Sequence, residues 1–190
     1  AKALVDHITL GNHSVTFSVL SDTKAVDRYR GVEVIPVWDP EKPLTLLRIP
    51  GAVLKLKPDL VHFNLHFAVF GRGRLPNMLG FLTVYTTHIL SRLIGYKTTV
   101  TLHNIPERIN LEKVGLHPTL GTRIGLLVAE KLVLSCHEVV VTMRSYVSIL
   151  GARFRRQVRW VPHGAWNLNC DDAEGGNPSH RDIVLFLGYL

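Results

Sequence analysis

Short segments rich in β-branched residues alternate along this chain with longer segments whose apolar residues recur at helical spacing. We expect strands at residues 13–20, 32–37, 60–63, 97–102, 138–142, 157–161 and 182–187. Helices are expected at residues 44–57, 77–94, 119–134 and 145–151. Pro50-Gly51 should break the first of them, and Asn77 and Gly95 should cap the two ends of the second. This alternation predicts an α/β fold, in which a parallel sheet is covered by helices on both faces.

The length of the chain suits one such domain. Its 190 residues, of which 46% are hydrophobic, are enough for one α/β domain with a substantial core, but leave little room for two. Residues 1–5 have the composition of a helix interior with no capping residue before them, so we expect that the beginning of the domain is missing. Residues 171–180 are polar and contain Gly, Pro and Ser, which is typical of a linker.

The positive net charge of the chain indicates which classes of binding partner to expect. There are 22 Lys and Arg against 15 Asp and Glu, a formal net charge of +7, which favours nucleic acid, an acidic membrane surface or a phosphorylated sugar. The basic residues are scattered apart from Arg153, Arg155, Arg156 and Arg159, with neither interleaved aromatic residues nor a helix-turn-helix pattern. We therefore expect no nucleic-acid partner.

The apolar and cysteine patterns bear on localisation. Residues 78–95 are the most apolar segment, but they are too short and too polar to span a bilayer, so this helix is either buried or rests on a membrane together with Arg72 and Arg74. Cys136 and Cys170 form no disulfide framework and no CxxC pair. Without a secretion signal, we expect a cytoplasmic protein, in peripheral contact with the inner membrane face if the helix rests there.

Polar residues follow four of the expected strands, and the carboxyl ends of parallel strands meet at one edge of a sheet, where ligands bind. For each residue, turn formation is the alternative explanation. The four groups are Asn64-Leu65-His66, His103-Asn104-Ile105-Pro106-Glu107, Thr142-Met143-Arg144-Ser145 and Pro162-His163-Gly164.

Five segments carry a resemblance. They are KPDLVH at residues 57–62, TVTLHN at 99–104, EVVVT at 138–142, VRWVPHG at 158–164 and IVLFLG at 183–188. In this order and spacing, over nearly the whole chain, they resemble the N-terminal domain of retaining GT-B glycosyltransferases of family four. The resemblance implies a Rossmann-like, N-terminally truncated acceptor-side domain at residues 1–164 and a linker at 165–181. Residues 182–190 would then hold the first strand of a missing C-terminal donor-binding domain.

The same resemblance assigns roles to the strand-end residues. His103 would contact the donor sugar, because a neutral imidazole can bond a hydroxyl near the charge that develops at the anomeric carbon; the alternative is a turn histidine bonded to backbone. Glu107 would bond an acceptor hydroxyl or cap a loop, and Arg144 would hold an anionic acceptor or lie solvated at the surface. At His163, before Gly164, the family more often has asparagine, which leaves the role of that side chain open.

The remaining candidates are one strand's histidines and the other polar strand-end residues. Alternation lets His62 and His66 face one way, where one of them could meet a sugar hydroxyl. With no third ligand at a usual spacing, we expect no zinc, and nothing in the sequence implies a cofactor. The polar residues that complete the candidate substrate site are Asn64, Asn104 and Thr142.

The expected function is transfer of a hexose from a nucleotide-sugar to a hydroxyl of a sugar or lipid-linked acceptor, with retention, in polysaccharide or glycoconjugate biosynthesis. The groups that stabilise the leaving diphosphate would lie in the missing domain, so this segment should not turn over alone. Two alternatives remain: a sugar-nucleotide epimerase of the same two-domain plan, and a non-catalytic domain that binds a glycan or a protein. The sequence does not reveal the donor sugar or the acceptor.

Overall fold

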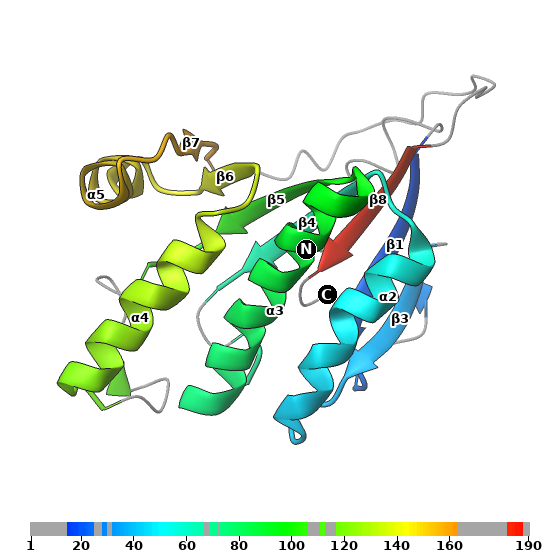
Figure 1. The fold of residues 1–190 in the computed structure, drawn as a ribbon, viewed down its shortest axis with the longest axis horizontal. Helices are drawn as coiled ribbons and strands as arrows, with labels where there is room; N and C mark the ends of the chain where they lie inside the picture. The colour runs from blue at the N-terminus through cyan, green and yellow to red at the C-terminus, as the bar shows by residue number, and fades with distance from the viewer. Residues whose placement is uncertain are drawn as a thin grey trace, which may run out of the picture.

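The computed structural model describes residues 15–24, 28–29, 32–66, 69–71, 73–105, 111–112, 117–162 and 182–187 (Figure 1). Their strands form a single sheet in the order β2-β3-β1-β8-β4-β5-β6-β7, in which only the β2/β3 pair is antiparallel. The strands are β1 (Val15–Asp22), β2 (Arg28–Tyr29), β3 (Val32–Trp38), β4 (Leu60–Leu65), β5 (Lys97–Leu102), β6 (Glu138–Val141), β7 (Arg159–Trp160) and β8 (Asp182–Leu187). The helices are the 3-10 helix η1 (Pro43–Leu47), followed by α2 (Arg48–Leu56), α3 (Arg74–Ile94), α4 (Leu120–Val133) and α5 (Arg144–Phe154). This arrangement confirms the α/β class and a Rossmann-like parallel sheet.

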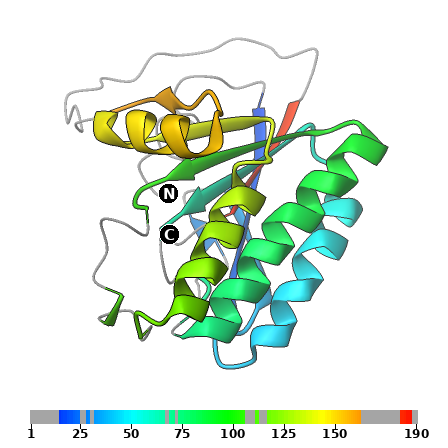
Figure 2. The ribbon, with the colours of Figure 1, turned by 60° about the vertical axis from the view of Figure 1, so that its left-hand side comes forward.

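Helices α2, α3 and α4 lie side by side over one face of the sheet (Figures 1 and 2). The central strands β4 and β5 turn apolar side chains towards this layer, among them Val61, Phe63 and Val100, each at most 1% exposed. Alternation along these strands leaves the intervening residues, such as His62 and Asn64, half-buried on the other face. The two faces of β4 and β5 therefore differ in polarity: one is core, and the other carries hydrogen-bonding groups.

Two helix boundaries differ from the sequence-based expectations. Pro50-Gly51 does not break a helix, because Pro50 lies in the first turn of α2, where its missing N–H has no partner to lose. The break comes earlier, where η1 gives way to α2. Asn77 is not the cap of α3, whose N-cap is Gly73; the Asn77 side chain instead donates to the carbonyl oxygens of Gly71 and Gly73, at 2.9 and 2.7 Å.

Two other boundaries agree with the sequence. Gly95 ends α3 with φ = +102°, a left-handed conformation that glycine adopts without strain, and its N–H donates to the Ser91 carbonyl oxygen at 2.8 Å. Thr119 caps α4, where its Oγ1 accepts a hydrogen bond from the Thr122 N–H at 3.2 Å.

Strand β8 differs from the domain division implied by the resemblance. It lies inside the sheet and pairs in parallel with β1 on one side and with β4 on the other, whereas the resemblance implies that it opens a donor-binding domain. The physical reason is that β1 and β4 would otherwise each present an unpaired edge, and a short apolar strand satisfies both. The division into an acceptor-side domain, a linker and a donor-binding domain stays a prediction.

Candidate functional site

The carboxyl ends of β4, β5, β6 and β7 lie at the same edge of the sheet, as expected. Leu65 pairs with Leu102, Leu102 with Val141, and Val141 with Trp160, so the residues that follow these strands emerge together. Three of the predicted site residues, Glu107, His163 and Gly164, lie outside the described residues. The others divide into three groups.

The first group is His103 with Asn64. The His103 backbone N–H donates to the Leu65 carbonyl oxygen at 2.9 Å, which extends the pairing of β4 and β5 by one residue. Its imidazole Nε2 lies 2.5 Å from Asn64 Oδ1. Because an amide oxygen can only accept, Nε2 donates this hydrogen bond. Both side chains are half-buried, and the pair fixes the imidazole at the rim.

His62 lies next to this pair but within β4 rather than at its end. Its Nδ1 is 2.7 Å from Thr99 Oγ1 and its Nε2 is 3.3 Å from Thr101 Oγ1. Burial lowers the pKa of His62 to about 4, and the nearby His103 lowers it further. His62 is thus neutral at pH 7 and engages two threonines of β5, which makes it part of the support of this polar face.

The second group, His66 and Asn104, lines a cavity of about 20 Å³, which has room for about one water molecule. Apolar residues of β4, β5, α3 and α4 form most of the remaining wall, and Glu130 of α4 contributes the carboxylate. We did not select Glu130 from the sequence. The available signal was its helical spacing, since it shares a face of α4 with the buried Val133 and the partly buried Leu126.

The Glu130 carboxylate is unusual in its environment. The side chain is 7% exposed; Oε2 lies 3.2 Å from Arg153 Nη1 of α5, and Oε1 has no hydrogen-bond partner among the described residues. Burial dominates over this ion pair and raises the pKa of Glu130 to about 7. A carboxyl group with such a pKa changes protonation near neutral pH.

The third group is centred on Arg144, at the start of α5. Its guanidinium carbon lies 5.8 Å from the centre of the Trp160 ring, and both residues line an open groove of about 620 Å³ between α5 and β7. Ser145 and Ser148 add hydroxyl groups to this groove. Thr142, just before it, has a buried Oγ1 without a partner in the described part of the chain. Arg144 therefore belongs to a different hollow from the one that His66 lines.

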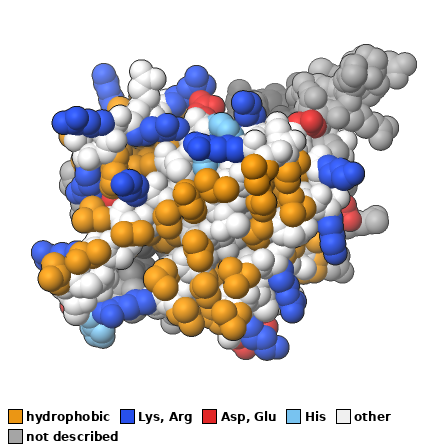
Figure 3. Space-filling view, viewed as in Figure 1, with side chains coloured by type: hydrophobic (Ala, Val, Ile, Leu, Met, Phe, Trp, Pro, Cys, Tyr) orange, Lys and Arg blue, Asp and Glu red, His pale blue; other side chains and the backbone are white. Residues whose placement is uncertain are grey.

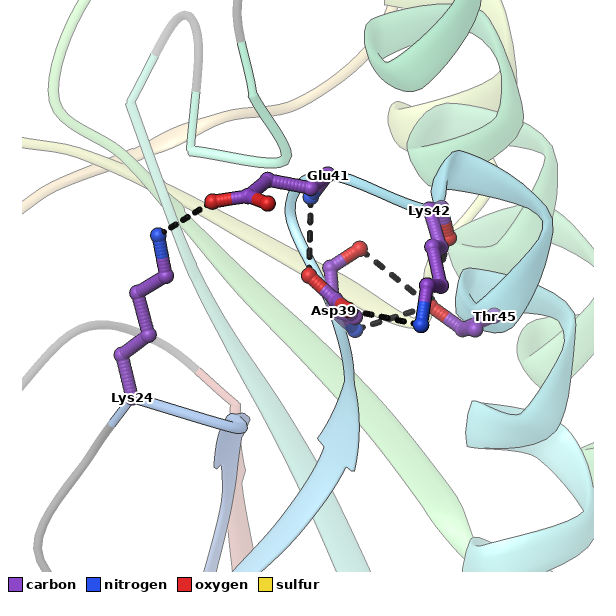
Figure 4. Close-up of polar contacts among 5 residues, drawn as sticks. All are labelled: Lys24, Asp39, Glu41, Lys42 and Thr45. Carbon is purple, nitrogen blue, oxygen red and sulfur yellow. Dashed lines mark hydrogen bonds and ion pairs between the residues drawn. The ribbon is translucent and has the colours of Figure 1, made fainter.

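A polar turn follows β1 and β3 at the same edge, and we did not select it from the sequence (Figure 4). The Asp39 N–H donates to Thr45 Oγ1 at 2.8 Å, Asp39 Oδ1 accepts from the Glu41 N–H at 2.9 Å, and Lys24 Nζ lies 2.7 Å from Glu41 Oε1. Glu41 raises the pKa of Lys24 through a hydrogen bond and its charge. Because these groups satisfy one another, we interpret the turn as structural.

The described residues contain no group of three or more His, Cys, Asp or Glu side chains arranged to hold a metal ion. Among the helices that the structure describes, none has the length and apolar character required to cross a bilayer. Comparison with known proteins finds no matching family model, no similar curated protein and no similar solved structure.

Proposed function

We propose that this chain is the acceptor-side half of a retaining hexosyltransferase that uses a nucleotide-sugar donor. The observation that carries the proposal is the His103–Asn64 pair at the carboxyl edge of a parallel sheet, the place where α/β folds bind ligands. The sequence resemblance supplies the reaction class, and the pair supplies a fixed, polar, half-buried imidazole where a sugar hydroxyl would sit.

The proposed role of His103 follows from its bonding. With Nε2 bonded to Asn64, the imidazole is held at the edge of the sheet, where, as the resemblance implies, it would hydrogen-bond a hydroxyl of the donor sugar and tolerate positive charge that develops at the anomeric carbon. Neighbouring His62, with its pKa lowered to about 4, adds no positive charge at neutral pH. In retaining transfer of this kind the acceptor's proton passes to the leaving diphosphate on the same face of the sugar, so no protein nucleophile is required.

The other site residues would act on the acceptor side. Glu107 is proposed to meet an acceptor hydroxyl, and Arg144 an anionic group of the acceptor. The guanidinium of Arg144 lies in an open groove beside two serine hydroxyls, which suits a phosphate. A lipid-linked acceptor would require the protein to work at a membrane surface, and we include peripheral membrane association in the proposal.

The test uses the protein encoded by the uninterrupted reading frame. Nucleotide-sugars are screened for release of nucleoside diphosphate with and without candidate acceptors, and the active pair is repeated with His103→Ala. Because His103 would act in the transition state, we expect a loss of about 100-fold or more in kcat. His117→Ala, which changes an exposed histidine that is not among the candidate site residues, is the matched control and should keep full activity.

Two results would contradict the proposal. Equal turnover by His103→Ala and His117→Ala would show that His103 has no role in catalysis. Conversion of a nucleotide-sugar to its epimer without acceptor, and without diphosphate release, would replace transfer with epimerisation.

A further inference from the structure

The outer surface of helices α2, α3 and α4 exposes many large apolar side chains, and we call this surface the helical face. Exposed fractions reach 78% at Leu93 and 76% at Leu120. In Figure 3 these apolar side chains cover much of the surface above the three helices. The members are Leu54, Leu75, Met78, Leu82, Ile89, Leu93, Ile94, Leu120, Ile124, Leu127 and Val128. An apolar surface of this extent is typical of a site that binds a partner or a membrane.

The charges on the helical face all have one sign. Its exposed charged residues are Arg48, Lys55, Arg74, Arg92, Arg123 and Lys131. The three helices, which the structure describes in full, contain a single acidic residue, Glu130, and that residue is buried. Figure 3 shows Lys and Arg side chains bordering the apolar area. The face therefore combines exposed apolar groups with cations and presents no exposed carboxylate.

This composition favours an anionic lipid bilayer over other occupants. A second copy of the chain, docked through the same face, would place six cations against six cations. A nucleic acid would pair with the cations but would leave the leucine and isoleucine side chains without an apolar partner. Headgroup phosphates and the adjoining acyl chains satisfy both groups at once, as they do for interfacial amphipathic helices.

We infer that the helical face docks on an anionic membrane surface, with α2, α3 and α4 lying along the plane of the headgroups. Exposed apolar side chains would enter the headgroup–acyl boundary, and the surrounding Lys and Arg side chains would contact lipid phosphates. The inference extends the peripheral association included in the proposed function, but it rests on the composition of this surface and is independent of the reaction.

The docked orientation has a consequence for the candidate site. The first turns of α3 and α4 lie together, since Arg74 Nη2 of α3 is 3.3 Å from Oγ1 of Thr119, the N-cap of α4. These two helix starts follow the carboxyl ends of β4 and β5, where His103 lies. The site edge would therefore be close to the headgroups, which suits a lipid-linked acceptor.

The experiment measures co-sedimentation of the full chain with vesicles of phosphatidylcholine, either pure or mixed with phosphatidylglycerol. We expect binding to the mixed vesicles only, and weaker binding at high salt. Lys55→Glu/Arg123→Glu reverses two charges on the helical face and should reduce binding at least five-fold. Lys24→Glu/Arg155→Glu, two exposed residues outside the three helices, makes the same change in net charge and should leave binding unchanged.

A second variant tests the apolar part of the inference. Leu93→Ser/Ile124→Ser removes two exposed side chains that do not belong to the core, and it should weaken binding to the mixed vesicles at least three-fold while circular dichroism shows an unchanged fold. Equal binding of the two charge variants, or no binding by the wild type, would overturn the inference. So would a concentration-dependent dimer that this serine variant dissolves. No sugar donor is present, so failure of the transferase proposal would leave these results intact.

Discussion

Glu130 is an acidic residue on the buried side of helix α4, where apolar residues are the rule. Helix α4 buries one side against the sheet, and Glu130 lies on that side with Ala129 and Val133. Its carboxylate pairs with Arg153, on α5. The cost of burying the charged form exceeds the gain from this one ion pair, so the protonated form is favoured in the folded state.

Replacing Glu130 with Gln should stabilise the protein at high pH. The pKa is about 7 in the folded state and 4.5 in an unfolded chain, so folding stability falls as pH rises through this interval and the full cost is present above pH 7. Glu130→Gln removes that cost and should raise the free energy of unfolding by about 1–3 kcal/mol at pH 8, with little effect at pH 4. Urea denaturation at both pH values measures the difference.

Glu138→Gln serves as the control for this prediction, because Glu138 also pairs with an arginine, Arg159, but its side chain is 41% exposed. Its replacement should not produce a gain that grows with pH. An equal effect of Glu130→Gln at pH 4 and pH 8 would show that the buried charge does not cost stability.

The side-chain contacts of the polar face near His103 could not be predicted from the sequence. Alternation predicted that His62 and His66 face one way, but β4 ends at Leu65: His62 bonds to threonines of β5, whereas His66 lines the cavity with residues of α3 and α4. His62 lies opposite Thr99 of β5 and Asn64 opposite Thr101, and the side chain of Asn64 bonds to His103, the residue after β5. That register depends on how two segments separated by α3 pair in space, and no local pattern specifies it.

At the scale of elements, the segments were predicted well and their ends less well. Residues 97–102 and 182–187 were predicted as strands with the bounds that β5 and β8 have. The start of α3 was misplaced because Asn77 is a good N-cap residue, whereas the backbone begins the helix at Gly73 and uses Asn77 to hold the preceding loop. Intrinsic preference could not reveal this tertiary use.

A substitution at Gly80 in α3 tests how closely this helix packs against Phe70. A Cβ at this position would lie 2.0 Å from Cδ2 of the Phe70 ring, so the ring, or the helix, must move. Gly80→Ala should therefore destabilise the protein by about 1–3 kcal/mol in urea denaturation, although alanine is the better helix former.

Gly125 of α4 is the matched control, because a Cβ there meets nothing within 4 Å. Gly125→Ala should stabilise by about 0.5–1 kcal/mol through helix propensity alone. If both alanine variants were stabilising, the close packing of Phe70 against α3 would be refuted.

At the scale of the whole molecule, buried histidines should make the fold sensitive to acid. Besides His62, His88 has a pKa lowered to about 4, first by burial and then by the charge of His137 and of nearby arginines. His88 is 1% exposed; its Nδ1 lies 2.8 Å from Thr98 Oγ1, and the centres of the His88 and His137 rings are 4.9 Å apart. Protonation of His62 or of His88 would oppose folding.

The free energy of unfolding should fall as pH drops from about 6.5 towards 4. A folded pKa below the unfolded value of 6.5 gives stability that is present in full above pH 6.5 and lost through this interval, about 2–5 kcal/mol for the two residues together. Urea denaturation at several pH values measures this slope. Glu130 contributes in the opposite direction, so the decisive comparison is between variants.

His88→Gln should make this loss on acidification smaller by removing one of the two groups, at some cost in stability at pH 7.5. His117→Gln, at an exposed position, should reproduce the wild-type slope. A wild-type slope in His88→Gln would mean that its burial is not coupled to acid unfolding.

The sheet itself was predicted in class but not in strand order. The alternation of segments was sufficient for a parallel α/β fold. The position of β8 in the sheet could not be predicted from the sequence. A six-residue apolar strand fits any interior place of a parallel sheet, and the neighbours of β8, β1 and β4, come from distant parts of the sequence.

The central place of β8 has a consequence for the order of events during synthesis. Strands β1 to β3 and β4 to β7 form two groups with no pairing between them except through β8, so the ribosome delivers both groups before the strand that joins them. In that interval each group keeps one backbone edge open to other chains. The two groups already share one core through η1, α2 and α3, so what residues 182–187 add on leaving the exit tunnel is the backbone pairing that closes the edges of β1 and β4.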